Sequence, residues 1–473
     1  MSVNERQPLI VNTNKIVSRT FKCKHFILFP TANLLFFGYV VQFYVISQWI
    51  HNVIQKKANH QGDGGPSECS LSNSSDPRFI SFQNVEKRTA VWQLYFMIAS
   101  SLPAFFATAI LPSYSDTFGR RFLFVFSYSA YLLKYILCGL TIFYEWHLIW
   151  LIVASFLEGI TGSYFTVYSG CYSFIADVTE PGRQRTLVFT LFDGIQLLTL
   201  TLGGFVAGYF IEFQGYFVPM ALCTLIQFCA WVLALIFLPE TLQEENICDV
   251  TSVFTNLKRT VDFYRSDEFS GKRAAYTLLV LSIFTAEMAG SNRASIELLY
   301  QLGKPFCWPS QKIGLFSAAR HAAQGLAGIC LITPLKKCLS EVSIAIISNF
   351  SNTASFVLEA FAKSDLMLYL VPVPALLGRL TVSMSKSLMS SMTDPDKQGS
   401  LFASITAVTS ICGFTAPFLN NAVYAATVTF FNGFIFLVLA GFCLLGFTLL
   451  LIFAKTQQVK TTGETIEKVV SDD

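Results

Sequence analysis

The C-terminal part of the chain contains a long stretch without any charged side chain. No Asp, Glu, Lys or Arg occurs between Lys397 and Lys455. A helix of about 20 apolar residues crosses the hydrocarbon core of a bilayer, and a helix satisfies its own backbone polar groups there. The stretch therefore predicts two membrane-spanning helices, with the Asn420-Asn421 pair as the tight turn between them.

Similar apolar segments recur along the whole chain, in which 53% of the residues are hydrophobic and 13% are charged. Soluble domains contain about 25% charged residues, so the composition indicates a polytopic membrane protein. The first apolar run begins near residue 25 and is too long for the core of a removable signal peptide. The twelve predicted spans are 25–50, 90–112, 122–144, 147–176, 187–211, 215–238, 275–302, 312–334, 341–362, 366–390, 400–422 and 426–454.

Lys and Arg residues in short loops indicate which ends of the spans are cytoplasmic. They gather in the two tails and the even-numbered loops, with the first external loop, 51–89, as an exception. The net charge of +3 thus reflects topology, and it does not suggest a nucleic-acid partner. The predicted organisation is an all-α membrane protein with two six-helix bundles. Its parts are a cytoplasmic tail (1–24), a first bundle (25–238), a cytoplasmic linker (239–274), a second bundle (275–455) and a cytoplasmic tail (456–473).

Two of the twelve cysteines are predicted to lie on the oxidising side of the membrane. Cys69 lies in the first external loop and Cys307 in the loop after the seventh span. A disulfide between them and two free thiols are both possible, and we expect the disulfide. The first external loop also contains Asn73 in an Asn-x-Ser sequence, which predicts N-glycosylation.

Enzyme motifs are missing from the sequence. It contains no H-E-x-x-H, C-x-x-C, G-x-S-x-G or P-loop pattern, and its five histidines are scattered. We therefore expect neither catalysis nor a metal or other cofactor. A secondary transporter and a non-transporting sensor built on the same scaffold both remain possible, because a fold does not fix a function.

The segment 113–124, SYSDTFGRRFLF, places charges between two predicted spans. Asp116 can end one helix and Gly119 can let the chain turn, so the charges are expected to lie in water. From charge alone, the loop could be an anchor of positive-inside residues with no further role.

The SDTFGRR stretch resembles the loop signature of the major facilitator superfamily, although Pro112 stands where that family has its first Gly. Other stretches resemble solute carrier family 46, the family of the proton-coupled folate transporter. They are ADV (176–178), LPETL (238–242), LLYQLGKPFCW (298–308), KIG (312–314), ARH (319–321) and QGSLFASI (398–405). The resemblance implies the major facilitator fold, a disulfide between the first and fourth external loops, and proton-coupled symport of an organic solute towards the cytosol. A facilitator without proton coupling is the alternative within the same fold.

The resemblance also implies a cytoplasmic gate in the loop after the second span. Its latch would join Asp116 to Arg120, with Asp177 at the end of span 4 as a further partner. Gly119 and Arg121 belong to the same motif.

Charged side chains inside spans are candidates for the transport mechanism, because each costs about 2.5–3.5 kcal/mol at a helix centre unless it is paired or wet. Asp193, near the start of span 5, lies where the folate transporter has a Glu implicated in proton coupling, so we expect it to carry the coupling proton. A structural, hydrogen-bonding Asp is the alternative. Glu158 and His321 are further candidates for proton coupling, and His321 could equally be a packing residue.

Arg379 resembles an Arg of the family's tenth span, and its permanently charged guanidinium suits an anionic substrate. Glu287, Arg293 and Arg320 are further substrate-binding candidates, although Arg293 could instead pair with Glu297 on one helix face. Ser163 and Gly290 stand where the folate transporter has an acidic residue and a His, which disfavours folate itself as the substrate.

The N-terminal tail contains an acidic dileucine pattern. Glu5 is followed, after three other residues, by Leu9 and Ile10. Sorting adaptors read such signals in membrane proteins bound for lysosomes. The pattern favours the lysosomal membrane, with the plasma membrane as the alternative, and it would make the non-cytoplasmic side lumenal.

We predict that Cys69 and Cys307 are cross-linked. Mass spectrometry of a non-reduced digest should find one species that contains both peptides, and reduction should separate them. Cys338, which is predicted to face the reducing cytoplasm, is the control and should be alkylated as a free thiol in both digests. Alkylation of Cys69 and Cys307 without reduction would refute the prediction.

Overall fold

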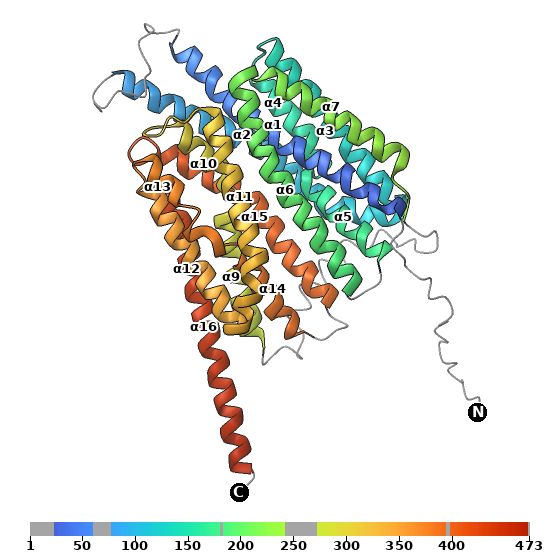
Figure 1. Cartoon of the computed structure of the whole chain (residues 1–473), viewed down its shortest axis with the longest axis vertical. Coiled ribbons are helices and arrows are strands. Elements are labelled where there is room, and N and C mark those ends of the chain that lie inside the picture. Colours follow the sequence, from blue (N-terminus) through green and yellow to red (C-terminus); the bar gives the residue numbers. More distant parts are fainter. Residues whose placement is uncertain (1–22, 60–76, 180–182, 242–271, 394–397, 472–473) are drawn as a thin grey trace, which may run out of the picture.

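The computed structural model describes residues 23–59, 77–179, 183–241, 272–393 and 398–471, and it consists of helices joined by short turns (Figure 1). The first half contains η1 (Cys23–Ile27), α1 (Leu28–Asn59), α2 (Pro77–Phe118), α3 (Arg120–Phe143), α4 (Ile149–Ile160), α5 (Ser163–Val178), α6 (Arg183–Gln214) and α7 (Phe217–Phe237). The second half contains α9 (Arg273–Gly290), α10 (Arg293–Leu302), α11 (Ser310–Cys338), α12 (Glu341–Ala360), α13 (Asp365–Leu370), η4 (Pro374–Leu377), α14 (Leu380–Ser391), α15 (Gln398–Thr427) and α16 (Phe434–Ser471).

Every predicted span overlaps a helix or a helix interrupted near its middle, although the last one, 426–454, begins in α15 and crosses the turn before α16. The interrupted spans are the fourth (α4 and α5), the seventh (α9 and α10) and the tenth (α13, η4 and α14). Within the described residues, nine helical segments are long and apolar enough to cross a membrane. The predicted spans outside that set are 312–334, 341–362 and 400–422, which correspond to the helices α11, α12 and α15.

The low hydropathy of α12 comes from polar side chains that face other helices. Ser348, Asn349, Ser355 and Glu359 are all buried. A helix that turns its polar side chains into the protein can present an apolar surface to lipid.

The turn before the last helix is not at the predicted place. The prediction of a turn at Asn420-Asn421 is wrong, because α15 continues through both residues to Thr427. Their side chains are buried, and the amides donate to the carbonyl oxygens of Met288 and Pro417, respectively. The helix tolerates the two Asn residues because their amides find acceptors inside the protein.

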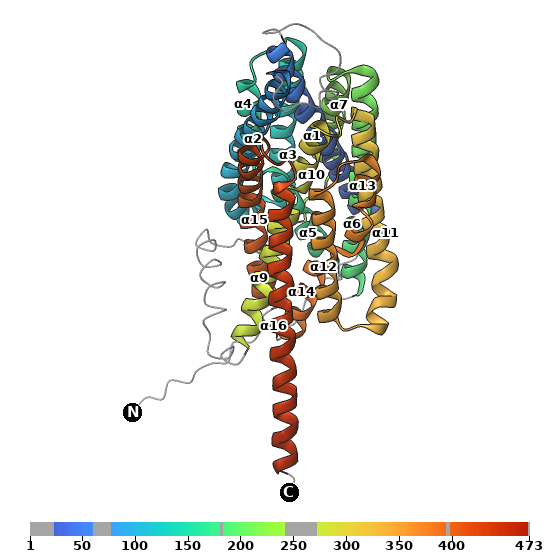
Figure 2. The ribbon, with the colours of Figure 1, turned by 90° about the vertical axis from the view of Figure 1, so that its left-hand side faces the viewer.

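The helices form two bundles that lie side by side (Figures 1 and 2). In the first bundle α1 packs on α6 and α7, α2 on α4, and α3 on α7. In the second, α12 and α9 pack on α16, and α14 packs on α12. The end of α16 extends well beyond its bundle (Figure 1).

The contact between the two bundles, which we call the seam, consists mainly of α6 against α11 and α2 against α15. Gly208 of α6 and Gly314 of α11 allow the two backbones to touch. A Cβ atom on Gly208 would lie 2.5 Å from the Ser310 oxygen and 2.9 Å from the Gly314 Cα. A side chain at this position would therefore push the helices apart.

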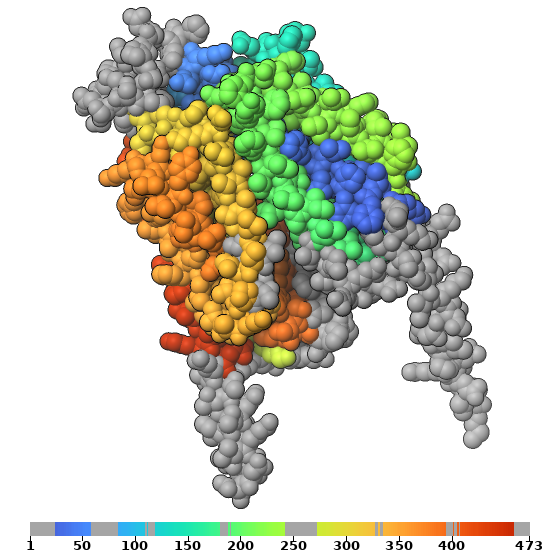
Figure 3. Space-filling view, in the orientation of Figure 1, coloured from blue at the N-terminus to red at the C-terminus, as the bar shows by residue number. Residues whose placement is uncertain are grey.

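Hydrogen bonds cross the seam on the predicted lumenal side. Tyr44 Oη and Ser317 Oγ are 2.5 Å apart, and Ser310 Oγ donates to Gln48 Oε1 at 2.5 Å. Further bonds run from the Ser310 backbone N–H to Glu212 (3.1 Å), from Ser295 to Gln93 (3.0 Å) and from the Lys304 backbone N–H to Glu86 (3.1 Å). The bundles are in contact near the top of Figure 3 and diverge toward the bottom. The structure thus shows the two bundles closed together at the ends that are predicted to be lumenal.

Cys307, in the turn between α10 and α11, forms a disulfide. Its predicted partner, Cys69, lies outside the described residues, so the pairing itself stays a prediction. The cysteines within the described parts of the spans are free thiols, as expected for small packing residues.

We predict that Gly208→Ala destabilises the closed arrangement, because the added methyl group overlaps the backbone of α11. Overpacking of this kind costs about 1–3 kcal/mol, so the purified variant should unfold at a lower temperature than the native protein. Gly441→Ala is the matched control, since Gly441 also lies inside a helix and a Cβ there has nothing within 4 Å. Equal melting temperatures for the two variants would contradict the close contact.

Candidate functional site

One buried ion pair lies inside the first bundle, beside the break in its fourth span. Glu158, in the last turn of α4, pairs with Lys134 of α3, and both side chains are buried. Tyr131 Oη donates to Glu158 Oε1 at 3.0 Å, and Ser163 Oγ at the start of α5 donates to the same oxygen. Glu158 therefore has an ammonium and two hydroxyl partners. These partners compensate a buried carboxylate, but they leave it poorly placed to collect protons from water.

A larger set of paired charges lies inside the second bundle, and we call it the C-bundle network: Arg293, Glu297, Arg320 and Glu359. Arg293 reaches Glu359 at 2.7 Å and Glu297 at 2.5 Å, while Arg320 reaches Glu297 at 3.0 Å. All four side chains are buried. Two guanidinium groups and two carboxylates balance each other, which is how a protein keeps charges away from water.

The pairing within one helix that the sequence allowed is therefore present between Arg293 and Glu297. Arg293 and Arg320, both predicted to bind substrate, have carboxylate partners inside the bundle instead. Glu359 completes the network from 66 residues away in the sequence. Ser355, which is 62 residues from Arg293, also accepts a hydrogen bond from its guanidinium group.

Four other predicted residues and two tyrosines of α5 form what we call the central site between the bundles: Asp193, Glu287, His321 and Arg379, with Tyr168 and Tyr172. Asp193 and Arg379 are exposed, and Glu287 and His321 are half-buried. Arg379 interacts electrostatically with Glu287 in its own bundle and with Tyr168 in the other bundle. His321 lies near Arg320, Arg379 and Arg293.

Two tyrosines hold the carboxylate of Asp193. Tyr168 Oη donates to Asp193 Oδ1 at 3.0 Å, and Tyr172 Oη donates to the same oxygen. Both donors use Oδ1, so neither hydroxyl donates to the other oxygen of the carboxylate. Tyr168 is hydrogen-bonded to the carboxylate of the first bundle and interacts electrostatically with Arg379 of the second. The tyrosines were not predicted, although their spacing of four residues on α5 places them on one helix face.

Arg379 differs from Arg293 and Arg320, the two buried arginines of its bundle. None of the described carboxylates forms an ion pair with Arg379, whereas Arg293 pairs with two carboxylates and Arg320 with one. An exposed guanidinium between the two bundles can bind a carboxylate, sulfate or phosphate group in a bidentate manner.

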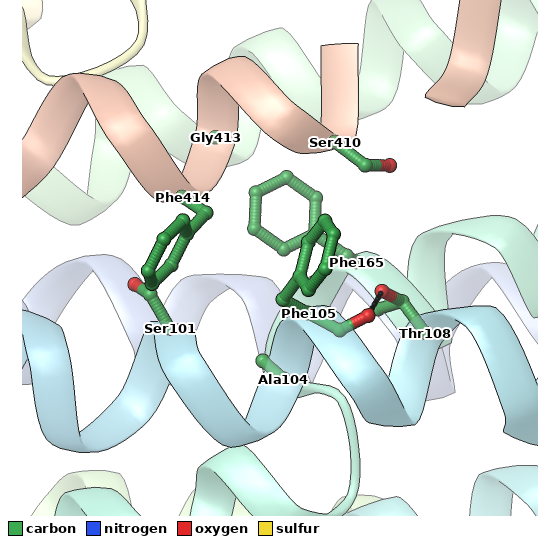
Figure 4. Close-up of a pocket in the computed structure, with 8 residues that line it drawn as sticks. All are labelled: Ser101, Ala104, Phe105, Thr108, Phe165, Ser410, Gly413 and Phe414. Carbon is green, nitrogen blue, oxygen red and sulfur yellow. Dashed lines mark hydrogen bonds between the residues drawn. The ribbon is translucent and has the colours of Figure 1, made fainter. Parts of the chain in front are cut away.

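A small cavity also lies between the bundles, among Phe105, Thr108, Phe165 and Phe414 (Figure 4). Phe105 of α2 and Phe414 of α15 have ring centroids 5.8 Å apart. The cavity holds about 10 Å³, which is room for a single water molecule. These aromatic rings close the seam between α2 and α15 and leave no room for an organic solute.

The predicted gate loop is fastened to its own bundle. Arg120 Nε pairs with Asp177 Oδ2 at 3.0 Å, and Thr241 Oγ1 donates to the same oxygen at 3.2 Å. The Glu240 carboxylate accepts the backbone N–H groups of Arg120 (2.8 Å) and Arg121 (3.0 Å) at the start of α3. A carboxylate at a helix N-terminus is favourable because it satisfies free donors and opposes the helix dipole.

Gly119 makes the contact between the Glu240 carboxylate and the start of α3 possible. It adopts φ of 100°, and a Cβ atom there would overlap the Glu240 carboxylate. The helix α2 continues past Asp116 to Phe118, so Asp116 does not end it as predicted. The side chain of Asp116 lies outside the described residues, and the predicted latch from Asp116 to Arg120 stays a prediction. The role of Glu240 was not predicted, although it belongs to the LPETL stretch noted in the sequence.

Four other predicted site residues, Asn73 of the glycosylation sequence and Glu5, Leu9 and Ile10 of the sorting pattern, also lie outside the described residues.

Comparison with curated proteins finds relatives along most of the chain. The lysosomal proton-coupled steroid conjugate and bile acid symporter SLC46A3 of Homo sapiens is 29% identical over 411 residues, covering 84% of this chain and 88% of the relative. The proton-coupled folate transporter of Rattus norvegicus is 26% identical over 414 residues, covering 87% and 88%. No family model matches the chain.

Solved structures show the same fold. The human organic anion transporter MFSD10 (TETRAN) superposes with a TM-score of 0.61 at 14% identity, covering 91% of this chain and 100% of that one. The peptide transporter POT in complex with sulfate gives 0.62 at 13% identity, covering 92% and 94%. The chain is therefore a relative of the solute carrier family 46 transporters, built on the major facilitator fold.

Proposed function

We propose that the protein is a secondary active transporter that couples the movement of an organic anion towards the cytosol to the movement of protons. The observation that carries the proposal is the central site. There the Asp193 carboxylate of one bundle accepts from Tyr168, and the same tyrosine interacts electrostatically with Arg379 of the other bundle, which has no ion-pair partner among the described carboxylates. A site built from both bundles can change when the bundles rock against each other.

Asp193 is the proposed coupling residue. It is exposed and lies where water can deliver a proton, whereas Glu158 is buried with three partners. Protonation of Asp193 would remove a negative charge from the central site and alter its interaction with the tyrosines. Arg379 is the proposed ligand of the anionic group of the solute, because it has a permanent charge and no carboxylate partner among the described residues.

The relatives support this class of activity and the class of solute. One is named a symporter of steroid conjugates and bile acids and the other a folate transporter, and both are named as proton-coupled. A rigid or aromatic organic body with an acidic group fits both names. These names do not favour a non-transporting sensor or an uncoupled facilitator.

We place the protein in the lysosomal membrane. The acidic dileucine pattern at Glu5, Leu9 and Ile10 supports this location, with a sorting adaptor as the partner of the N-terminal tail. The first of the relatives named above is also described as lysosomal. An acidic lumen would supply the protons for export of the solute to the cytosol.

We predict that Asp193→Asn abolishes solute accumulation driven by a pH gradient and spares solute exchange at equal pH. A step of two pH units stores roughly 2.7 kcal/mol per proton, from 1.36 kcal/mol per unit, which supports about a hundredfold solute gradient. The Asn variant cannot take up the proton, but exchange requires no net proton release. The measurement is the ratio of gradient-driven uptake to equal-pH exchange in reconstituted vesicles, with a labelled sulfated steroid as the probe.

Three further variants sharpen this test. Arg379→Ala should weaken solute binding in both assays, whereas Lys363→Ala, which removes an exposed cation, should change neither. Glu145→Gln is the control for loss of a carboxylate, since that side chain is 78% exposed. If Asp193→Asn reduces both assays equally, or neither, Asp193 does not couple the proton.

A further inference from the structure

Glu86 is a buried carboxylate at the lumenal end of the seam. It lies on α2, ahead of the predicted span 90–112, and its side chain is 3% exposed. Oε1 accepts the backbone N–H of Lys304 at 3.1 Å, and Lys304 belongs to the other bundle. Oε2 is buried and has no hydrogen-bond partner among the described residues. A carboxylate thus takes part in the contact between the bundles with one oxygen unsatisfied.

The turn that Glu86 contacts is held firmly by the second bundle. The Lys304 oxygen accepts from Asn432 Nδ2 at 2.9 Å, so this residue is bound through its N–H to one bundle and through its carbonyl to the other. A Cβ atom on Gly303 would overlap Glu86 Oε1. The carboxyl group therefore lies directly against the backbone of the turn, and parting of the bundles would expose it to water.

The charged and titratable groups that face Glu86 come from the second bundle. Lys304 interacts with it electrostatically. Tyr424 of α15 also interacts with Glu86, and its hydroxyl has no partner among the described residues. An ionised carboxylate that is cut off from water and lacks a partner costs free energy, and protonation removes this cost.

We propose that Glu86 is a second proton-binding site, which takes up a proton from the lumen as the lumenal ends of the bundles close. This inference rests on the proposed function, because closure of the seam matters as one step of a transport cycle. The proton enters and leaves on the same side of the membrane. Glu86 therefore changes how readily the seam closes at each lumenal pH, and it does not add to the number of protons transported with the solute.

A second carboxylate, Glu212 of α6, also bonds across the seam. It accepts the backbone N–H of Ser310 at the start of α11, and it is exposed. The contact of an exposed carboxylate with a helix end is weak and is screened by salt, so the buried Glu86 determines the sign of the pH dependence.

The test measures closure directly, by hydrogen–deuterium exchange of the full-length protein in detergent. Peptides that cover residues 303–317 contain the amides of Lys304 and Ser310, which are bonded across the seam. After correction for intrinsic exchange rates, their protection should rise on acidification from about pH 7.5 to about pH 5.5. One linked proton allows at most roughly a tenfold rise per pH unit.

Two variants identify the residue responsible. Glu86→Gln keeps the shape and the acceptor for Lys304, so its protection should be high and nearly independent of pH. Gln93→Ala is the matched control, because Gln93 lies on the same helix and bonds across the seam to Ser295 without titrating. It should lower protection by the same factor at every pH and keep the pH dependence.

The outcomes separate this inference from the proposed function. Native protection that does not rise on acidification, or an unchanged pH dependence in Glu86→Gln, overturns the inference. In vesicles, Glu86→Gln should reach the native level of gradient-driven accumulation. Its initial uptake rate should depend less steeply on lumenal pH than that of the native protein. Loss of accumulation, as expected for Asp193→Asn, would also overturn it. If the native protein shows no transport but its protection follows pH as described, the proposed function fails and the proton site at Glu86 stands.

Discussion

An ionised side chain held away from water needs partners, and this requirement determines how both bundles are built. In the first bundle Glu158 is matched by Lys134 and two hydroxyl groups. In the second bundle Arg293 is matched by carboxylates from α10 and α12. These pairs lie beside the breaks in the fourth and seventh spans, where the chain changes direction. Their mutual neutralisation leaves Arg379 as a cation with no carboxylate partner among the described residues.

The same principle separates structural charges from functional ones. A carboxylate with all its partners in place, such as Glu158, stabilises the arrangement in which it is found. Asp193 has donors on one oxygen only and is exposed, and Glu86 has one oxygen without a partner. These incomplete sets of partners are the reason why Asp193 and Glu86 are the residues proposed to bind protons.

The sequence predicted the class of fold and the places of the helices well, because hydropathy reports contact with lipid directly. It did not predict the interruptions of the spans, since those depend on a few residues such as Gly162 with positive φ. The prediction of a turn at Asn420-Asn421 was wrong because the sequence does not show whether a polar side chain faces water or an acceptor inside the protein. Among the charges, the pair of Arg293 with Glu297 was predicted from its spacing of four residues. The contact of Arg293 with Glu359 was not, because it depends on how two helices pack. The lack of a carboxylate partner for Arg379 among the described residues likewise became clear only from the folded structure.

The glycine contact between α6 and α11 has a consequence for the energy available to the transporter. Where backbones touch without side chains, few rotamers are frozen and little apolar area is covered for each contact, so separating the helices costs little. Shifting a two-state equilibrium from 1:99 to 99:1 requires about 5.5 kcal/mol, and two pH units supply only about half of that per proton. A deeply interdigitated seam would lock the molecule in one state. At the contact of α6 with α11, bare backbone and a few hydrogen bonds bring the energy needed for separation closer to what a proton and a solute can supply.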